Sequence, residues 1–196
     1  MKHYRKFLES LEDMSNREMI KACEAAGLQK IGNGSCRVVF AINDKLVIKI
    51  ALGHAGVEQN ENEIRVWHML DYDFAGWKKY FAKIYVNLCH YKDYFIVMER
   101  LETQFTGRRK YANDLFAVRF RNNLTKAQRK AYLHYKAVEV LDYHLNYVNA
   151  TDMHIRNLGM SANGCVKMLD FGLSKRTIFQ HYGLSDRRRV KRELLR

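Results

Sequence analysis

The sequence predicts an α+β protein of two small lobes, in which an antiparallel sheet with one main helix precedes a minimal, mostly helical part. The 196 residues suffice for one good core or for two small lobes that share a cleft. Apolar runs of strand length surround one helical pattern at 57–70, and a longer helical pattern covers 125–147. We expect a helical N-terminal extension over 1–27, a sheet lobe over 28–101 and a helical lobe over 102–196.

The composition describes a globular chain with a basic surface. Hydrophobic residues make up 47% of the sequence, enough to fill a core, and no apolar run is long enough to span a bilayer. The four cysteines form no C-x-x-C pair and no signal peptide is recognisable, so we expect a soluble, cytoplasmic protein without a membrane partner. The net charge of +13 suits acidic protein substrates or nucleic acid, although a basic surface without a dedicated partner explains it equally well.

The first 27 residues are expected to fold as helices that pack against the rest of the chain. Apolar residues at helical spacing occur over 2–14, and Ser15 and Glu18 then form a capping box for a second helix. This second helix is expected to end at Gly27, because glycine is the usual residue just past a helix C-terminus.

A glycine-rich hairpin is predicted over residues 29–40. Gly32 and Gly34 have no side chains that would block a phosphate, so backbone N–H groups at this tip could face one closely. By itself such a hairpin is a weak signal. For Arg37, which follows the second glycine, we expect a solvated loop arginine, although it could also reach a phosphate.

The next strand carries a lysine that faces inward. Alternation places Lys49 on the same face as Val47, and a lysine among apolar neighbours needs an anionic partner. In the following helix, Glu63 shares its face with apolar residues at i+3, i+4 and i+7. We therefore predict a Lys49–Glu63 ion pair, with Glu61 as the alternative acid.

Two further strands are predicted over residues 80–86 and 94–101. Residues 102–123 then mix basic and aromatic side chains, a pattern typical of a solvated helix and also of a nucleic-acid surface. We favour the helix, since charge and aromatic content are the only support for nucleic acid. Thr125 is expected to cap the long helix that follows.

The most specific spacing joins Asp152, Asn157 and Asp170, the last of which directly precedes Phe171 and Gly172. Phosphoryl transfer from ATP needs one carboxylate to orient the attacking hydroxyl, and an asparagine and a second carboxylate to hold magnesium ions on the phosphates. The order D-x-x-x-x-N…D-F-G presents these groups as protein kinases do. Asp152 would therefore orient the acceptor, and Asn157 and Asp170 would hold Mg²⁺.

Over residues 28–174 the chain resembles the protein-kinase-like superfamily. The matching motifs are the glycine-rich loop, the V-I-K strand, the helix glutamate, the D-x-x-x-x-N loop and D-F-G, with Arg37 at the place of the loop's third glycine. The resemblance implies a two-lobed fold that uses ATP and Mg²⁺, with Lys49 held on the phosphates by Glu63.

The resemblance also implies a nucleotide site between the two lobes. Met98 would be its gatekeeper, while backbone groups of Glu99 and Leu101 would hydrogen-bond the adenine edge. The residues expected to contact ATP are Ile31, Gly32, Asn33, Gly34, Ser35, Val39, Lys49, Met98, Glu99 and Leu101.

Three departures from the protein-kinase pattern indicate a minimal and atypical kinase. Thr151 stands where an arginine reads a phosphorylated activation loop, so this mode of regulation should be absent. His154 replaces a lysine, as in the D-x-H-x-x-N motif of aminoglycoside and choline phosphotransferases and of compact phage-encoded kinases, and would lie near the transferred phosphoryl group. Only 24 residues follow Gly172 and the chain has no proline, so an A-P-E motif is absent and we expect a minimal second lobe.

The leading functional prediction is phosphorylation of Ser/Thr hydroxyls on proteins, resembling phage kinases that modify host proteins. The alternative is a small-molecule phosphotransferase of the aminoglycoside or choline type, which His154 favours. A kinase-like protein that binds a partner without catalysis would not need Lys49, Asp152 and Asp170. A nucleic-acid-binding module is supported by charge alone.

Overall fold

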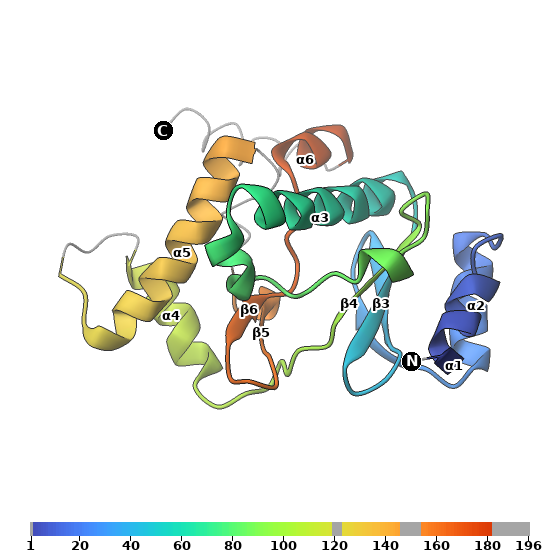
Figure 1. Cartoon of the computed structure of the whole chain (residues 1–196), viewed down its shortest axis with the longest axis horizontal. Helices are drawn as coiled ribbons and strands as arrows, with labels where there is room; N and C mark the ends of the chain where they lie inside the picture. The colour runs from blue at the N-terminus through green and yellow to red at the C-terminus, as the bar shows by residue number, and fades with distance from the viewer. Residues whose placement is uncertain (1, 119–122, 146–153, 182–196) are drawn as a thin grey trace.

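The computed structural model describes residues 2–118, 123–145 and 154–181 (Figure 1). Two lobes are connected by the segment that follows strand β4, so the predicted α+β architecture, with an antiparallel-sheet lobe and a mostly helical lobe, is confirmed. Thr151, Asp152 and the basic tail beyond residue 181 lie outside the described residues. No helix within the described ranges is long and apolar enough to cross a membrane.

The first lobe is built on one antiparallel sheet in which each strand pairs with the next along the chain. Its strands are short and rich in β-branched residues, as expected for a half-buried pleated surface. The sheet consists of β1 (Gln29–Asn33), β2 (Arg37–Ala41), β3 (Leu46–Ala51) and β4 (Phe95–Glu99).

Successive side chains along each strand point to opposite faces of this sheet. Ile48 and Ile50 face the N-terminal helices α1 (Lys2–Ser10) and α2 (Asn16–Ala25) within one apolar cluster. Val47 belongs instead to the second cluster, which includes the apolar stripe of α3 (His54–Tyr72). Since side chains in a strand alternate, Lys49 lies on the same face as Val47, toward α3.

The second N-terminal helix begins and ends as the sequence predicts, whereas the first ends at Ser10 although the apolar spacing continues to Met14. The Ser15 hydroxyl accepts from the Glu18 amide, and the Glu18 carboxylate accepts from the Ser15 amide at 2.8 Å, which completes the capping box. After α2 the chain turns at Gly27 with φ of 72°, a conformation that glycine adopts without strain. Leu8, Leu11 and Met19 are buried against the sheet.

The prediction of a strand over residues 80–86 is wrong. The chain forms two short 3-10 helices there, η1 (Ala75–Tyr80) and η2 (Val86–Leu88), with an extended linker between them. The linker divides its pairing between the two lobes, because Phe81 bridges to Met168 in the second lobe and Ile84 bridges to Met98 in the first. It therefore forms isolated bridges instead of a fifth strand of the sheet.

The second lobe is small and mostly helical. Helices α4 and α5 pack on each other, and a two-stranded hairpin lies beside them. Thr125 caps α5, because its hydroxyl accepts a hydrogen bond from the Gln128 amide at 3.2 Å. Its elements are α4 (Arg108–Val118), α5 (Lys126–Leu145), η4 (Ile155–Asn157), β5 (Leu158–Met160), β6 (Val166–Met168) and α6 (Lys175–His181).

A fully buried histidine makes this lobe sensitive to acid. The His134 ring stacks on Tyr80 with centroids 5.1 Å apart, and its Nδ1 lies 3.2 Å from the Tyr111 hydroxyl. Its Nε2 has no hydrogen-bond partner among the described residues. Burial lowers the pKa of His134 to about 4, because the imidazolium would lose its hydration and no carboxylate of the described residues compensates for this loss.

We expect the free energy of unfolding to fall as the pH drops from about 6.5 to about 4, since only the unfolded chain binds a proton at this histidine in that window. The slope from this single group is at most about 1.4 kcal/mol per pH unit. His134→Phe keeps the ring stacking on Tyr80 but cannot titrate, so its stability should depend less on pH. Urea unfolding at several pH values measures both slopes, and equal slopes would contradict the assignment.

Candidate active site

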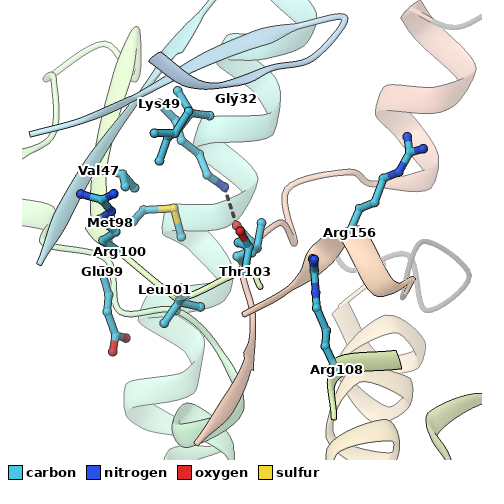
Figure 2. A pocket seen from close by; sticks show the side chains of 14 residues that line it. Gly32, Val47, Lys49, Met98, Glu99, Arg100, Leu101, Thr103, Arg108 and Arg156 are labelled. Carbon is cyan, nitrogen blue, oxygen red and sulfur yellow. Dashed lines mark hydrogen bonds between the residues drawn. The ribbon is translucent and has the colours of Figure 1, made fainter. Parts of the chain in front are cut away.

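A cavity of about 290 Å³ lies between the sheet and the second lobe. Its walls come from β1 to β4 on one side and from residues after β4, in η4 and before Asp170 on the other (Figure 2). Enclosure by apolar side chains with a few charged groups is typical of a small-ligand site. The lining residues are Ile31, Gly32, Val39, Val47, Lys49, Ala82, Met98, Glu99, Arg100, Leu101, Thr103, Arg108, Arg156 and Leu169.

The predicted ion pair between Lys49 and Glu63 is present. Lys49 Nζ lies 3.0 Å from Glu63 Oε1 and 3.1 Å from Oε2, and it also donates to the carbonyl of Leu169 at 2.6 Å. Burial lowers the pKa of Lys49, and Glu63 opposes this effect. The alternative acid, Glu61, instead pairs with Arg65 on the exposed face of α3, at 2.6 Å.

Asp170 is held in the same cluster by an arginine. Arg37 Nη2 lies 2.6 Å from Asp170 Oδ1, and Arg37 Nη1 lies 3.0 Å from Glu63 Oε1. Burial alone would raise the pKa of Asp170, but Arg37 and Lys49 outweigh it and lower the pKa to about 2. The cluster thus combines two cations, Arg37 and Lys49, with two carboxylates, and Asp170 is ionised at neutral pH.

The expectation of a solvated loop arginine at position 37 is wrong. Arg37 is buried with 5% exposure, and it opens β2 instead of lying in the loop. The strand alternation holds the signal that could have revealed this. Val39 pairs with Lys49 in the sheet and lines the cavity, and Arg37 precedes Val39 by two residues, so both side chains project from the same face of β2.

The D-F-G segment is packed tightly beneath α3. The Phe171 amide donates to Glu63 Oε1 at 3.3 Å, and its ring meets Phe81 edge to face with centroids 5.2 Å apart. Asn62 donates to the Gly172 carbonyl at 3.1 Å. These contacts turn Phe171 into the core and leave Asp170 at the cluster with Lys49 and Arg37.

Gly172→Ala is expected to destabilise the folded protein by about 1–3 kcal/mol, as overpacking of a filled site usually does. A Cβ at this position would clash with the backbone carbonyl of Gln59 in α3 and would lie 2.9 Å from the Glu63 Cγ. Both atoms belong to a packed helix, so the D-F-G segment must shift. Urea unfolding tests this, with Gly76→Ala as the control because a Cβ there meets no atom within 4 Å. Equal stability of the two variants would contradict the prediction.

The described part of the predicted catalytic loop holds His154 and Asn157 by local hydrogen bonds. His154 Nδ1 accepts the Arg156 amide at 3.1 Å, which orients the imidazole at the start of η4. Asn157 is buried, and its backbone carbonyl accepts the Leu169 amide at 2.9 Å, so it lies beside the residue that precedes Asp170. Asp152 is outside the described residues, and its role stays a prediction.

Asp170 and Asn157 offer the kinds of oxygen ligand that a magnesium ion takes. The Asp170 side chain is 34% exposed and ionised, so it can offer an oxygen to a cation. Mg²⁺ is usually held by one or two carboxylates together with substrate phosphates, and an asparagine amide oxygen completes such an oxygen set. The segments that carry the two residues adjoin, because the Leu169 amide donates to the Asn157 carbonyl.

Seven of the ten residues expected to contact ATP line the cavity. The Glu99 amide donates to the Lys83 carbonyl at 2.8 Å and its carboxylate pairs with Lys167 at 2.7 Å, so Glu99 would meet an adenine with its carbonyl. The other three, Asn33, Gly34 and Ser35, form the hairpin tip and are not part of the lining. The Gly34 amide donates to the Arg37 carbonyl at 2.9 Å, so it closes the turn instead of facing the cavity.

Two lining arginines were not anticipated by the sequence reasoning. Arg108 and Arg156 line the side of the cavity opposite Lys49 (Figure 2). Burial lowers the pKa of Arg108, and its Nε has no hydrogen-bond partner within the described ranges. The nearest sequence signal was the position of Arg156 between His154 and Asn157.

Comparison with known proteins adds little beyond the architecture. No protein-family model matches the sequence, and no curated protein matches it. Among solved structures, the chain is similar to the GDP and kanamycin complex of APH(2")-IIia, with 12% identity and a TM-score of 0.45 over 84% of this chain and 76% of that one.

Two more solved structures resemble the chain to a similar degree. The streptomycin–ATP complex of APH(2")-IIa has 12% identity and a TM-score of 0.45, over 92% of this chain and 85% of that one. The aminoglycoside phosphotransferase APH(2'')-Ib with ADP bound has 11% identity and a TM-score of 0.41, over 92% and 86%. Likeness at this level says nothing about activity, which has to follow from the site itself.

Proposed function

We propose that this protein transfers a phosphoryl group from ATP to a hydroxyl acceptor in the presence of Mg²⁺. The observation that carries the proposal is the buried contact of Lys49 with Glu63 and with the carbonyl directly before Asp170, at the wall of a cavity. A buried lysine held by a carboxylate next to an ionised aspartate is the arrangement that phosphoryl transfer requires.

The residues that the sequence predicted for the site have the following roles in this proposal. Lys49 donates to the nucleotide phosphates and Glu63 holds it in place. The apolar residues Val39, Val47 and Met98 enclose the base, and the Glu99 carbonyl accepts from its amino group. Asp170 and Asn157 hold Mg²⁺, which when bound neutralises charge on the phosphates. Asp152 is proposed to accept the proton of the attacking hydroxyl.

For the acceptor, we place a small hydroxylated molecule first. The reason is His154, whose ring is fixed by the Arg156 amide in a D-x-H-x-x-N segment of the kind that small-molecule phosphotransferases use. Arg108 and Arg156 add polar groups to the wall of the cavity. A protein Ser/Thr hydroxyl is the second candidate, favoured by the net charge of +13, which suits acidic protein partners.

Incubation of the full chain with γ-labelled ATP, Mg²⁺ and whole-cell lysate tests both the reaction and its acceptor. After transfer, the lysate is separated into protein and small-molecule fractions, and each is compared with the same reaction of Asp170→Asn. Label in the small-molecule fraction that disappears in the variant supports the first acceptor, and label on proteins supports the second. A chain that neither transfers label nor binds nucleotide would exclude both, and one that binds nucleotide without transfer would indicate a binding protein.

A further inference from the structure

Arg37 is the residue of the cluster for which the proposed reaction assigns no role. Its guanidinium donates to three acceptors from two different segments: Asp170 Oδ1 at 2.6 Å, Glu63 Oε1 at 3.0 Å and Asn60 Oδ1 at 3.2 Å. Such short bonds between a guanidinium and two carboxylates are charge-assisted and directional. The side chain is thus fixed against Asp170 and does not sample solvent.

The backbone and the neighbours of Arg37 hold it in this orientation. Arg37 pairs with Ala51 at the start of β2, so its Cα belongs to the sheet. Asn60 donates its side-chain amide to the Asp93 carbonyl at 2.8 Å, which turns Asn60 Oδ1 toward the guanidinium. A planar fork can bond both carboxylates at once, whereas the single ammonium of a lysine offers one point of charge.

The position of this cation affects how Asp170 can bind metal. Protein kinases hold two Mg²⁺ ions with the D-F-G aspartate and the catalytic-loop asparagine. In this protein one Asp170 oxygen accepts the bond from Arg37, so a cation that leaves this bond intact can take only the other oxygen of the partly exposed carboxylate. A second divalent ion would also lie close to a buried guanidinium of like charge.

We infer that Arg37 is a positioning residue that acts as a fixed cation on Asp170, so that the site takes one divalent ion with its nucleotide instead of two. This inference rests on the proposed function. Arg37 projects from the sheet and supplies positive charge beside the phosphates. It occupies the position at which the glycine-rich loop of protein kinases has its third glycine.

The number of bound ions can be counted with Mn²⁺ in place of Mg²⁺. Electron paramagnetic resonance titration of the full chain with a non-hydrolysable ATP analogue is expected to give one Mn²⁺ per chain in the wild type. Arg37→Gly and the bulkier, neutral Arg37→Gln free the Asp170 oxygen, and each should bind a second Mn²⁺. Two ions in the wild type, or one ion in both the wild type and the variants, would overturn the inference.

A measurement on the wild type alone keeps the test valid if the variants do not fold. At Mg²⁺ concentrations so low that the free nucleotide carries no ion, the logarithm of nucleotide affinity against the logarithm of free Mg²⁺ should rise with a slope near one, and a slope near two would overturn the inference. Arg65→Ala is the matched control, since it removes an arginine that pairs with Glu61 on the exposed face of the same helix that carries Glu63. Its ion count should equal that of the wild type.

If the wild type binds no Mn²⁺ even with nucleotide, the proposed function itself fails, which is a different result from binding two ions.

Discussion

Asp170→Asn is expected to lower the rate of phosphoryl transfer by about a thousandfold while the protein stays folded. A metal ion at the phosphates stabilises the transition state by several kcal/mol, and each 1.4 kcal/mol changes the rate about tenfold. Asparagine removes the negative charge that holds this ion. In the wild type, Arg37 lies 2.6 Å from Asp170 Oδ1, and the side-chain oxygen of asparagine can accept the same hydrogen bond. Glu63 still pairs with Arg37 in the variant. The partly exposed position of Asp170 limits the cost to folding.

Initial rates at several Mg²⁺ concentrations, together with thermal unfolding, measure these two effects separately. Asp114→Asn is the matched control, because Asp114 also accepts from a single cation, Lys110 at 2.8 Å, but lies on α4 away from the cluster. It should keep the wild-type rate. If Asp170→Asn also transferred phosphate at the wild-type rate, the metal-binding carboxylate would have to lie elsewhere in the chain.

Glu63→Gln is expected to lower the free energy of unfolding by about 3–5 kcal/mol, the usual effect of removing one partner of a buried ion pair. Glu63 is fully buried and accepts from Lys49, Arg37 and the Phe171 amide. Its loss leaves two buried cations facing a neutral amide whose NH₂ group cannot accept their bonds. Urea unfolding at neutral pH gives the size of the effect.

Lys49→Met is expected to destabilise the protein less than Glu63→Gln does. In that variant Glu63 keeps Arg37 at 3.0 Å, so its charge stays compensated and the loss of stability should be clearly smaller. Phosphoryl transfer should nevertheless fall in both variants, because the lysine on the phosphates is either absent or no longer held. Equal destabilisation by the two substitutions would contradict the central position that the structure gives to Glu63.

Local patterns in the sequence were sufficient for the elements that depend on near neighbours. The capping box at Ser15 and the helix end at Gly27 follow from residues within a few positions of each other. Lys49 and Glu63 were found in the same way, since each is a charged residue on an otherwise apolar face of its own strand or helix. In a small lobe, the apolar face of this strand and the apolar face of this helix can be buried mainly by packing against each other, which brings the two charged residues together.

The linker over 80–86 illustrates where local pattern is insufficient. Its aromatic and aliphatic residues have strand propensity, but its hydrogen bonds go to separate partners: the Ala82 amide to Met168 at 2.9 Å, and the Tyr85 amide to Val97 at 2.9 Å. These partners belong to different lobes. A segment that satisfies its backbone in two places cannot pair as one strand, and only the arrangement of the lobes decides this.

By itself the sequence determined the order of the motifs, the glycine-rich hairpin, the Lys49–Glu63 pair and the place of D-F-G. The tertiary structure decided which partners Arg37 meets. Strand alternation places its side chain on the same face as Val39, but it does not show that carboxylates lie there. A guanidinium is stable in a buried site only where carboxylates converge on it. Here one carboxylate is Glu63 of α3 and the other is Asp170, which follows Arg37 by 133 residues in the chain. That convergence depends on the register of β2 against β3 and on the packing of the second lobe against α3, which no local pattern records.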